Sequence, residues 1–326
     1  MHAGRYYTFK EVAWWTWRQS VIFVVIATLP TLAWTLGGLT FLAIPWPPIA
    51  LVGTAVAFVT GFKNNAAYGR LWEARQIWGG IINTSRIWAM QVRDLPTADV
   101  SRVLIERHLA WLTALRFQLR ESRTWEGVRR NAADIEFQHF YKVAEWETDV
   151  LTALTPLLST EDVALVKDSR NRAVTLLSRQ SKALKALADA GQLTDLRFVE
   201  LQRTLAALTD CQGRCERIKN FPYPRQFSTL NLFFVWTLIV TLPLALMPEL
   251  AKMGPHFVWA TIPLSASVSW IFHMIDRIGE ASENPFEGGA NDVPITAMSR
   301  TIEIDLRGML GDPQPPALTP TNNILM

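Results

Sequence analysis

Between Gly61 and Arg86 an apolar segment continues into a charged, amphipathic one, and no helix breaker stands at the join. Residues 49–62 carry no charged side chain, whereas residues 63–86 place lysine, arginine and glutamate on a stretch that keeps helical periodicity. Soluble domains rarely show this pattern. A helix that crosses a membrane and continues into the cytosol must have it, because only its lipid-embedded part has to be apolar. The junction therefore predicts a membrane protein and is typical of one that forms a pore.

Composition agrees with a membrane location. Hydrophobic residues make up 49% of the 326 residues and charged residues 19%. The net charge of +3 is too small, and too evenly spread, to indicate a nucleic-acid-binding protein. Cys211 and Cys215 lie four residues apart in a polar helical stretch with no histidine nearby. This spacing favours neither a disulfide nor a zinc site, so we expect two reduced thiols.

Four segments are long and apolar enough to cross a membrane. Prolines 45, 47 and 48 separate the first two, and Pro248, Gly254 and Pro255 separate the last two, so the spans form two hairpins with short outer turns. The first span is too long for a signal peptide. The predicted spans are about 21–44, 48–62, 227–247 and 256–275.

Basic residues flank these spans almost entirely on one side of the membrane, since the outer turns hold only Lys252, which Glu249 balances. Lys10 and Arg18 precede the first span, Lys63 follows the second, and Arg225 and Arg277 flank the second hairpin. The positive-inside rule then places both termini and the middle of the chain in the cytosol. The predicted organisation is a first hairpin in residues 1–62, a cytosolic region in 63–222, a second hairpin in 223–278 and a cytosolic end in 279–326.

The middle region is rich in leucine, alanine, arginine and glutamate with apolar residues at helical spacing. One such face comprises Leu104, His108, Trp111, Leu112, Leu115 and Leu119. We expect a cytosolic bundle of about four long helices, the last of them ended by Pro222. The fold class is thus all-α, with four membrane helices and a large cytosolic helical bundle. The proline-rich end of the chain, residues 313–320, is predicted to be a mobile tail.

Two stripes run along the second span. Gly53, Ala57 and Gly61 recur every four residues and allow another helix to approach closely. Thr54, Phe58 and Phe62 lie one position further round the helix. In a ring of identical subunits, the phenylalanines would form a hydrophobic constriction that gates by dewetting. From the residues alone, ordinary packing within one subunit is the favoured explanation of both stripes.

The same region resembles the bacterial branch of the bestrophin channels. Further matches are Pro222-Tyr223-Pro224 before the third span, Asn284-Pro285-Phe286 after the fourth, and Asn291-Asp292-Val293-Pro294 beyond it. The resemblance covers nearly the whole chain. Its densest part follows Gly61-Phe62-Lys63 and comprises Asn64, Asn65, Tyr68, Arg70, Trp72, Glu73, Arg75, Trp78 and the run from Asn83 to Arg86.

The resemblance implies a homopentameric channel in a bacterial inner membrane, with the lipid bilayer and monovalent ions as its other partners. Its neck would be lined by Thr54, Phe58 and Phe62, above a wider cytosolic cavity. A second constriction would lie near Phe221 or Tyr223, since the proline turn leaves two registers open. No catalytic constellation is present, so the resemblance and the residues together imply a protein that is not an enzyme.

Two positions depart from the family pattern. Eukaryotic members follow their Asn-Pro-Phe with an acidic, calcium-binding run, whereas this chain has Glu287, two glycines and an alanine before Asp292. A calcium site needs six or more oxygen ligands, so Asp292 is at best a vestigial metal ligand, calcium gating is doubtful, and no cofactor is expected. Thr54 is polar where the family usually has an apolar neck residue.

Selectivity follows least directly from the sequence. The pair Phe58 and Phe62 resembles the aromatic necks of the anion-selective relatives, which favours chloride-like ions. Lys63 would attract anions if it faced the lumen, but contact with a neighbouring helix is at least as compatible with its position. The alternatives are a sodium-permeable channel of the same architecture and a non-conducting membrane scaffold. His273 and Asp276 raise the hypothesis of a proton relay, although a salt-bridged helix end explains them more simply.

Overall fold

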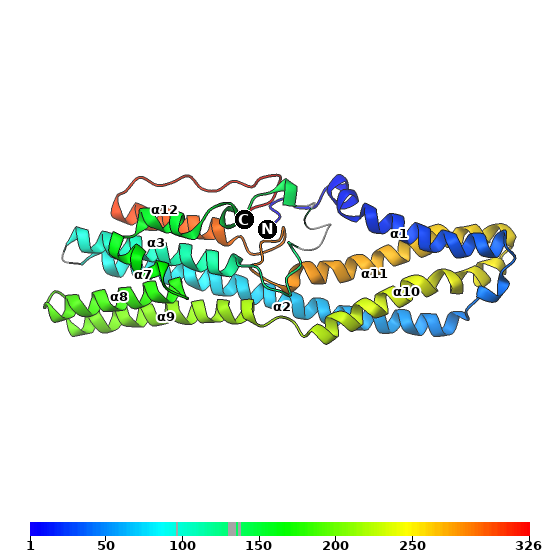
Figure 1. The fold of residues 1–326 in the computed structure, drawn as a ribbon, viewed down its shortest axis with the longest axis horizontal. Coiled ribbons are helices and arrows are strands. Elements are labelled where there is room, and N and C mark those ends of the chain that lie inside the picture. Colours follow the sequence, from blue (N-terminus) through cyan, green and yellow to red (C-terminus); the bar gives the residue numbers. More distant parts are fainter. Residues whose placement is uncertain (96, 130–134, 136–137) are drawn as a thin grey trace.

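The computed structural model describes residues 1–95, 97–129, 135 and 138–326. These residues form an elongated helical molecule with a membrane half and a second helical half, and both termini lie near the middle of its length (Figure 1). The described residues contain no strand beyond two isolated bridges at the chain ends. The predicted all-α class is therefore confirmed for this part of the chain.

Four helices of the membrane half are long and apolar enough to cross a bilayer. They pair as two hairpins, and the 3-10 turns Thr40–Leu42 (η1) and Pro255–Ala260 (η4) join them at the outer end of the molecule (Figure 1). Four helices of this kind confirm the predicted number of spans. Their bounds are Phe9–Thr35 (α1), Trp46–Arg93 (α2), Arg225–Ala251 (α10) and Thr261–Glu283 (α11).

The first helix occupies a different stretch from the predicted span at 21–44. It begins at Phe9 because Thr8 and Glu11 form a capping box, in which the side chain of each residue accepts a hydrogen bond from the backbone N–H of the other. It ends at Thr35, before Gly38 takes a positive φ of 65°. Because the first turn of the helix contains polar residues, a search for apolar residues alone does not find this boundary.

The second half of the molecule is a bundle around the continuation of α2. Its long helices are Ala98–Arg120 (α3), Arg172–Asp189 (α8), Asp195–Asn220 (α9) and Ile295–Leu310 (α12). Short helices join α3 to α8, namely Gln138–Phe140 (η2), Ala144–Glu147 (α5), Val150–Leu154 (α6), Thr155–Leu157 (η3) and Thr160–Lys167 (α7).

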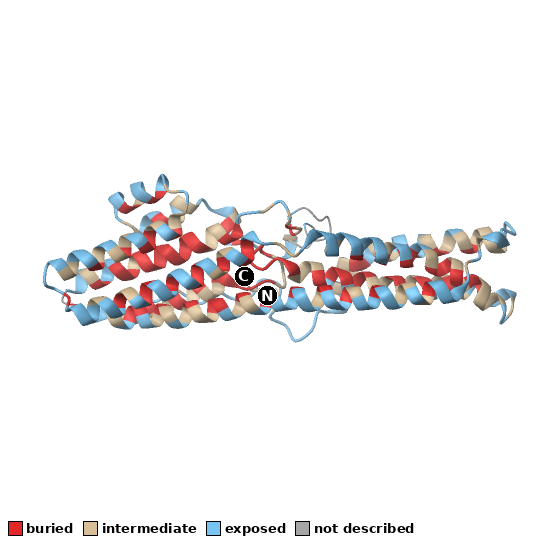
Figure 2. Ribbon diagram, turned by 90° about the horizontal axis from the view of Figure 1, so that it is seen from below, coloured by how far each residue is buried: buried red, intermediate tan, exposed pale blue. Residues whose placement is uncertain are grey.

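A continuous apolar core fills this bundle (Figure 2). The predicted face of α3 from Leu104 to Leu119 is buried in it. Some polar groups inside the core have partners: the indole of Trp111 donates to Gln212 at 2.9 Å, and His108 Nε2 lies 2.9 Å from Ser85 Oγ. As expected from Pro222, α9 ends at Asn220 and an irregular turn leads to α10.

The last residues of the chain, which follow the predicted tail at 313–320, are bonded to the rest of the structure. The backbone of Leu325 exchanges two hydrogen bonds with Met1, and the carbonyl of Met326 accepts from the N–H of Ala297 at 2.7 Å. Ile324 and Met326 are buried in a small apolar cluster with Tyr141 and Val143. Two apolar side chains and these backbone bonds anchor the segment 324–326.

Acid should destabilise this bundle through His108. Burial lowers the pKa of His108 to about 3, below its ordinary value of 6.5. The unfolded chain therefore binds a proton first as the pH falls, and full stability is present above pH 6.5. Between pH 6.5 and pH 3 we expect a loss of about 1.4 kcal/mol per pH unit from this residue. Denaturant unfolding of the purified protein across that range measures the slope.

The variant His108→Gln should flatten this dependence by about one proton. The variant His139→Gln, at an exposed position, is the matched control and should keep the wild-type slope. Equal slopes in wild type and His108→Gln would contradict the assignment.

Candidate functional site

Helix α2 has two opposite faces along its whole length. Residues at spacings of three and four are buried against the rest of the chain. Another series at the same spacings is exposed, with one gap at the half-buried Gly79 and Gly80. The buried series is Val56, Thr60, Lys63, Ala67, Leu71, Ala74, Trp78, Ile81, Ser85, Trp88 and Val92. The exposed series, here called the α2 stripe, is Thr54, Phe58, Phe62, Asn65, Gly69, Trp72, Gln76, Asn83, Ile87 and Met90.

The three predicted neck residues belong to the α2 stripe. Phe58 is 66% exposed and Phe62 is 60% exposed in the single chain. Their rings meet edge to face with centroids 4.5 Å apart, so they form one aromatic surface. The hydroxyl of Thr54 donates to the carbonyl of Ala50 at 2.9 Å and is thus partly satisfied by its own helix. Packing within one subunit therefore does not account for the two phenylalanines.

The small residues next to this stripe are only partly used inside the chain. A Cβ on Gly53 would lie 3.7 Å from Leu238 of α10, which is ordinary contact. Ala57 is exposed, and nothing lies within 4 Å of the position a Cβ would take on Gly61. A face of small residues that its own chain leaves open suits the close approach of a second helix.

Lys63 faces away from the α2 stripe. Its ammonium donates to Asp276 of α11 at 2.6 Å, and both side chains are almost fully buried. The same carboxylate oxygen of Asp276 accepts from Asn231 of α10 at 2.6 Å, and Asn231 in turn accepts from the hydroxyl of Thr60 at 2.9 Å. This polar network connects three membrane helices, and the charge of Lys63 is paired within the chain on the face of α2 opposite the stripe.

His273 takes no part in that network. It is buried beside the rings of Phe23 and Trp236, with centroids 5.3 and 6.0 Å away. Asp276 pairs with Lys63, and Arg277 pairs with Glu280 at 2.7 Å. The simpler prediction of a salt-bridged helix end thus fits the contacts, whereas a direct bond from His273 to Asp276 is not among those in the described chain.

Two residues after Lys63 connect α2 to α9 and α11. Asn64 donates to the carbonyl of Ile275 at 2.9 Å and lies directly over Gly279, where any Cβ would overlap its side chain. Arg70 donates to the backbone carbonyls of Glu283 at 2.8 Å and Ile218 at 3.0 Å. These two motif residues are therefore structural connectors.

Other motif residues near the neck divide between the two faces. Asn65, Tyr68 and Trp72 are exposed, and the rings of Tyr68 and Trp72 stack with centroids 6.4 Å apart. Glu73 pairs with Arg217 of α9, within the same chain. Arg75 is half-buried. The exposed three remain candidates for the wall of a cavity.

The two candidates for the lower constriction differ in exposure. Phe221 is 69% exposed at the end of α9, whereas Tyr223 is half-buried with its ring 6.3 Å from that of Phe227. Burial, with a smaller contribution from Glu283, raises the pKa of Tyr223 above its ordinary value, so its hydroxyl stays neutral. Phe221 is the better placed of the two to project from the chain.

The loop after α11 is wound around Asp292. Its carboxylate accepts from the backbone N–H groups of Phe286, Gly288 and Val293 and binds Arg120 at 2.7 Å. Asn284, Pro285 and Phe286 are buried, and Phe286 has a positive φ of 75°. Both oxygens of Asp292 are thus engaged and its charge is balanced by an arginine. These residues do not fit a calcium ion, which needs several free carboxylate oxygens.

Two long-range partners escaped the sequence reasoning, namely Asp276 for Lys63 and Arg120 for Asp292. Each pair is separated by more than a hundred residues, so local spacing carries no signal for it. The only available sign was a charged residue, such as Lys63, on a helix face that is otherwise apolar, since a buried charge needs a partner.

Comparison with known proteins gives a consistent result. A family model described as bacterial/fungal bestrophin protein matches residues 10–308. The voltage-dependent anion channel-forming protein YneE of Escherichia coli (strain K12) is 29% identical over 271 residues, which is 83% of this chain and 78% of that protein. The protein of the same name from Salmonella typhi is 29% identical over 294 residues, 90% of this chain and 85% of its own length.

Solved structures agree with the sequence relatives. The crystal structure of a bacterial bestrophin homologue from Klebsiella pneumoniae superposes with a TM-score of 0.76 at 26% identity. The match covers 90% of this chain and 98% of the other. A further crystal structure, of a membrane protein carrying one substitution, gives a TM-score of 0.77 at 26% identity over 91% of this chain and 99% of that one.

The buried pair between Lys63 and Asp276 generates a stability prediction. Lys63→Met should cost about 3–5 kcal/mol, because it leaves the Asp276 carboxylate unpaired in a low-dielectric interior. The double variant Lys63→Met/Asp276→Asn removes that charge and should recover a large part of the loss. Unfolding of the detergent-solubilised protein, followed by circular dichroism, measures both.

The matched control is Lys252→Met, since Lys252 forms an exposed pair with Glu249 in the outer turn. Its unfolding temperature should stay close to that of the wild type. A similar loss in the two lysine variants would contradict the importance of the buried pair.

Proposed function

The chain belongs to the bacterial/fungal bestrophin family, whose members are channels and not enzymes, and we propose that it forms a homopentameric channel for small monovalent anions such as chloride. In this proposal the α2 helices of five subunits surround the axis, and Thr54, Phe58 and Phe62 line a hydrophobic neck. The observation that carries it is the α2 stripe, which stays exposed along a helix that is otherwise buried on its opposite face.

The α2 stripe has the chemistry of a pore wall. Its membrane part presents Phe58 and Phe62, and its continuation presents amide side chains such as Asn65, Gln76 and Asn83. None of its ten residues is charged. A narrow apolar ring followed by a polar wall corresponds to a dewetting gate above a hydrated cavity. The open small residues Ala57 and Gly61 would then lie at the contact between neighbouring subunits.

Membrane orientation follows the distribution of basic residues. Lys10, Arg18, Arg225 and Arg277 all lie toward the end of the membrane half that adjoins the helical bundle. In the proposed topology this bundle and both termini are cytosolic, in the inner membrane of a bacterium. The bundle would form the vestibule, and Phe221 would narrow its exit or its junction with the membrane part.

Two features support anions over cations. The edges of aromatic rings carry partial positive charge, and a ring of phenylalanine edges can therefore face a partly dehydrated anion. The amides of the stripe and the indole of Trp72 supply N–H donors below the neck. Relatives whose names describe anion channel formation point in the same direction.

Reconstitution in planar bilayers under a chloride gradient tests selectivity. We expect a reversal potential displaced from zero toward the chloride equilibrium value, because the α2 stripe carries no charged side chain and its N–H donors favour anions. A reversal potential near the sodium value would establish a cation channel of the same architecture. If neither the wild type nor a variant with a widened neck conducts current, the result would support a non-conducting membrane scaffold.

The widened neck variant is Phe58→Ala. It should raise single-channel conductance several-fold, because removing the ring widens the narrowest apolar segment and favours wetting. Phe257→Ala is the matched control, since Phe257 is a half-exposed phenylalanine in the outer turn η4. Unchanged currents in Phe58→Ala would remove this residue from the constriction.

A further inference from the structure

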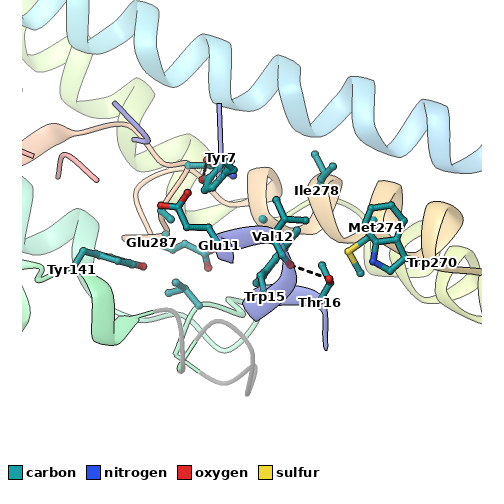
Figure 3. Close-up of a pocket in the computed structure, with 15 residues that line it drawn as sticks. Tyr7, Glu11, Val12, Trp15, Thr16, Tyr141, Trp270, Met274, Ile278 and Glu287 are labelled. Carbon is teal, nitrogen blue, oxygen red and sulfur yellow. Dashed lines mark hydrogen bonds between the residues drawn. The ribbon is translucent and has the colours of Figure 1, made fainter. Parts of the chain in front are cut away.

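A cavity of about 370 Å³ lies between α1 and α11, where the membrane half meets the bundle (Figure 3). It is separate from the α2 stripe, since no residue of α2 lines it. Its volume is within the range of small-molecule sites. The loop after α11 and the segment around Tyr141 close its other side.

One end of this cavity is apolar. Trp15 and Val12 of α1 face Trp270, Met274 and Ile278 of α11 across it (Figure 3). These side chains can enclose a ring or a short alkyl chain. Because α1 and α11 are both membrane helices, a hydrophobic molecule dissolved in the bilayer can reach this end.

The other end collects oxygen atoms that accept hydrogen bonds. The phenol of Tyr7 donates its proton to Asn291 at 2.7 Å, and the phenol of Tyr141 donates to the carbonyl of Gly288 at 3.0 Å. Each phenol thus directs its proton to the protein, and toward a ligand its oxygen acts as an acceptor. Glu11 adds a carboxylate, of which one oxygen binds Thr8 and the other lies 3.8 Å from His2.

Glu287 gives this end a second carboxyl group. It is buried, and one of its oxygens lies 3.3 Å from the N–H of Gly127. Burial, reinforced by the nearby charges of Glu126 and Asp292, holds its pKa well above the ordinary value. Among the lining residues that the structure describes, all ionisable groups are carboxyls or phenols, and none is lysine, arginine or histidine.

We propose that this cavity binds an amphipathic amine, with its ammonium group at Glu11 and Glu287 and its apolar body between Trp15 and Trp270. Acceptors and acidic groups at one end select a cationic donor, and the aromatic end selects a hydrophobic body. A carboxylate ligand of the same shape is disfavoured, because it would face the Glu11 carboxylate and two phenol oxygens whose protons are directed to the protein.

Phenylbutylamine is the probe, compared with phenylbutanol and phenylbutyrate, which share its body. Calorimetry on the full-length protein in lipid nanodiscs, corrected with empty nanodiscs, should detect saturable binding of the amine. We expect the alcohol to bind about tenfold more weakly, since one charge-assisted contact contributes about 1.4 kcal/mol. Phenylbutyrate should show no saturable binding.

Two variants separate charge from shape. Glu11→Gln keeps the capping box. It should lower the affinity for the amine about tenfold and leave the affinity for the alcohol unchanged. Ala281→Phe fills the cavity and should abolish binding of both. Glu249→Gln, at the outer end of α10, is the charge control and should bind the amine like the wild type. Size-exclusion profiles verify that each variant is assembled. Equal affinity of the wild type and Ala281→Phe for the amine, or equal affinity of the wild type for amine and carboxylate, would overturn the proposal.

Discussion

Helix α2 crosses from lipid into water without a break, and the arrangement of the other long helices follows from this. It contains no proline after Pro48, and its 48 residues extend over about 70 Å, more than twice the thickness of the hydrocarbon core. Helices α10 and α11 pack on its membrane part, and α3, α9 and α12 pack on its continuation. One rigid helix thus fixes the rotational position of both halves, and the α2 stripe remains on one side throughout.

Buried charges hold the two halves together at their boundary. Lys63 binds Asp276 just before α2 leaves the membrane half, and Arg70 binds the backbone end of α11 two turns later. Arg120 then binds Asp292 in the loop that follows α11. Such pairs contribute little net stability, but each strongly disfavours any arrangement that leaves one partner unpaired. They therefore specify how the membrane hairpins sit on the bundle.

Helical periodicity predicted much of this fold but not its long-range partners. The spacing of Leu104, His108 and Trp111 identified the buried face of α3, and four apolar segments identified the membrane helices. The start of α1 was missed, because Thr8 and Glu11 define it through capping and not through hydrophobicity. The stripe of Phe58 and Phe62 was found from spacing, whereas its exposure required coordinates. Periodicity shows which face of a helix is buried, but it does not identify what covers that face.

An uncharged stripe has a consequence for the selectivity of the proposed pore. Lys63, the charge closest to the neck, is neutralised by Asp276 on the opposite face of α2, so no fixed charge sets the sign of the potential at Phe58 and Phe62. Discrimination between anions and cations then depends on ring edges and amide dipoles, whose fields are much weaker than that of a full charge. A neck of this kind favours one sign of ion by a small free energy. Exchange of a few neutral residues is then sufficient to reverse the preference, which would let one architecture serve both kinds of ion.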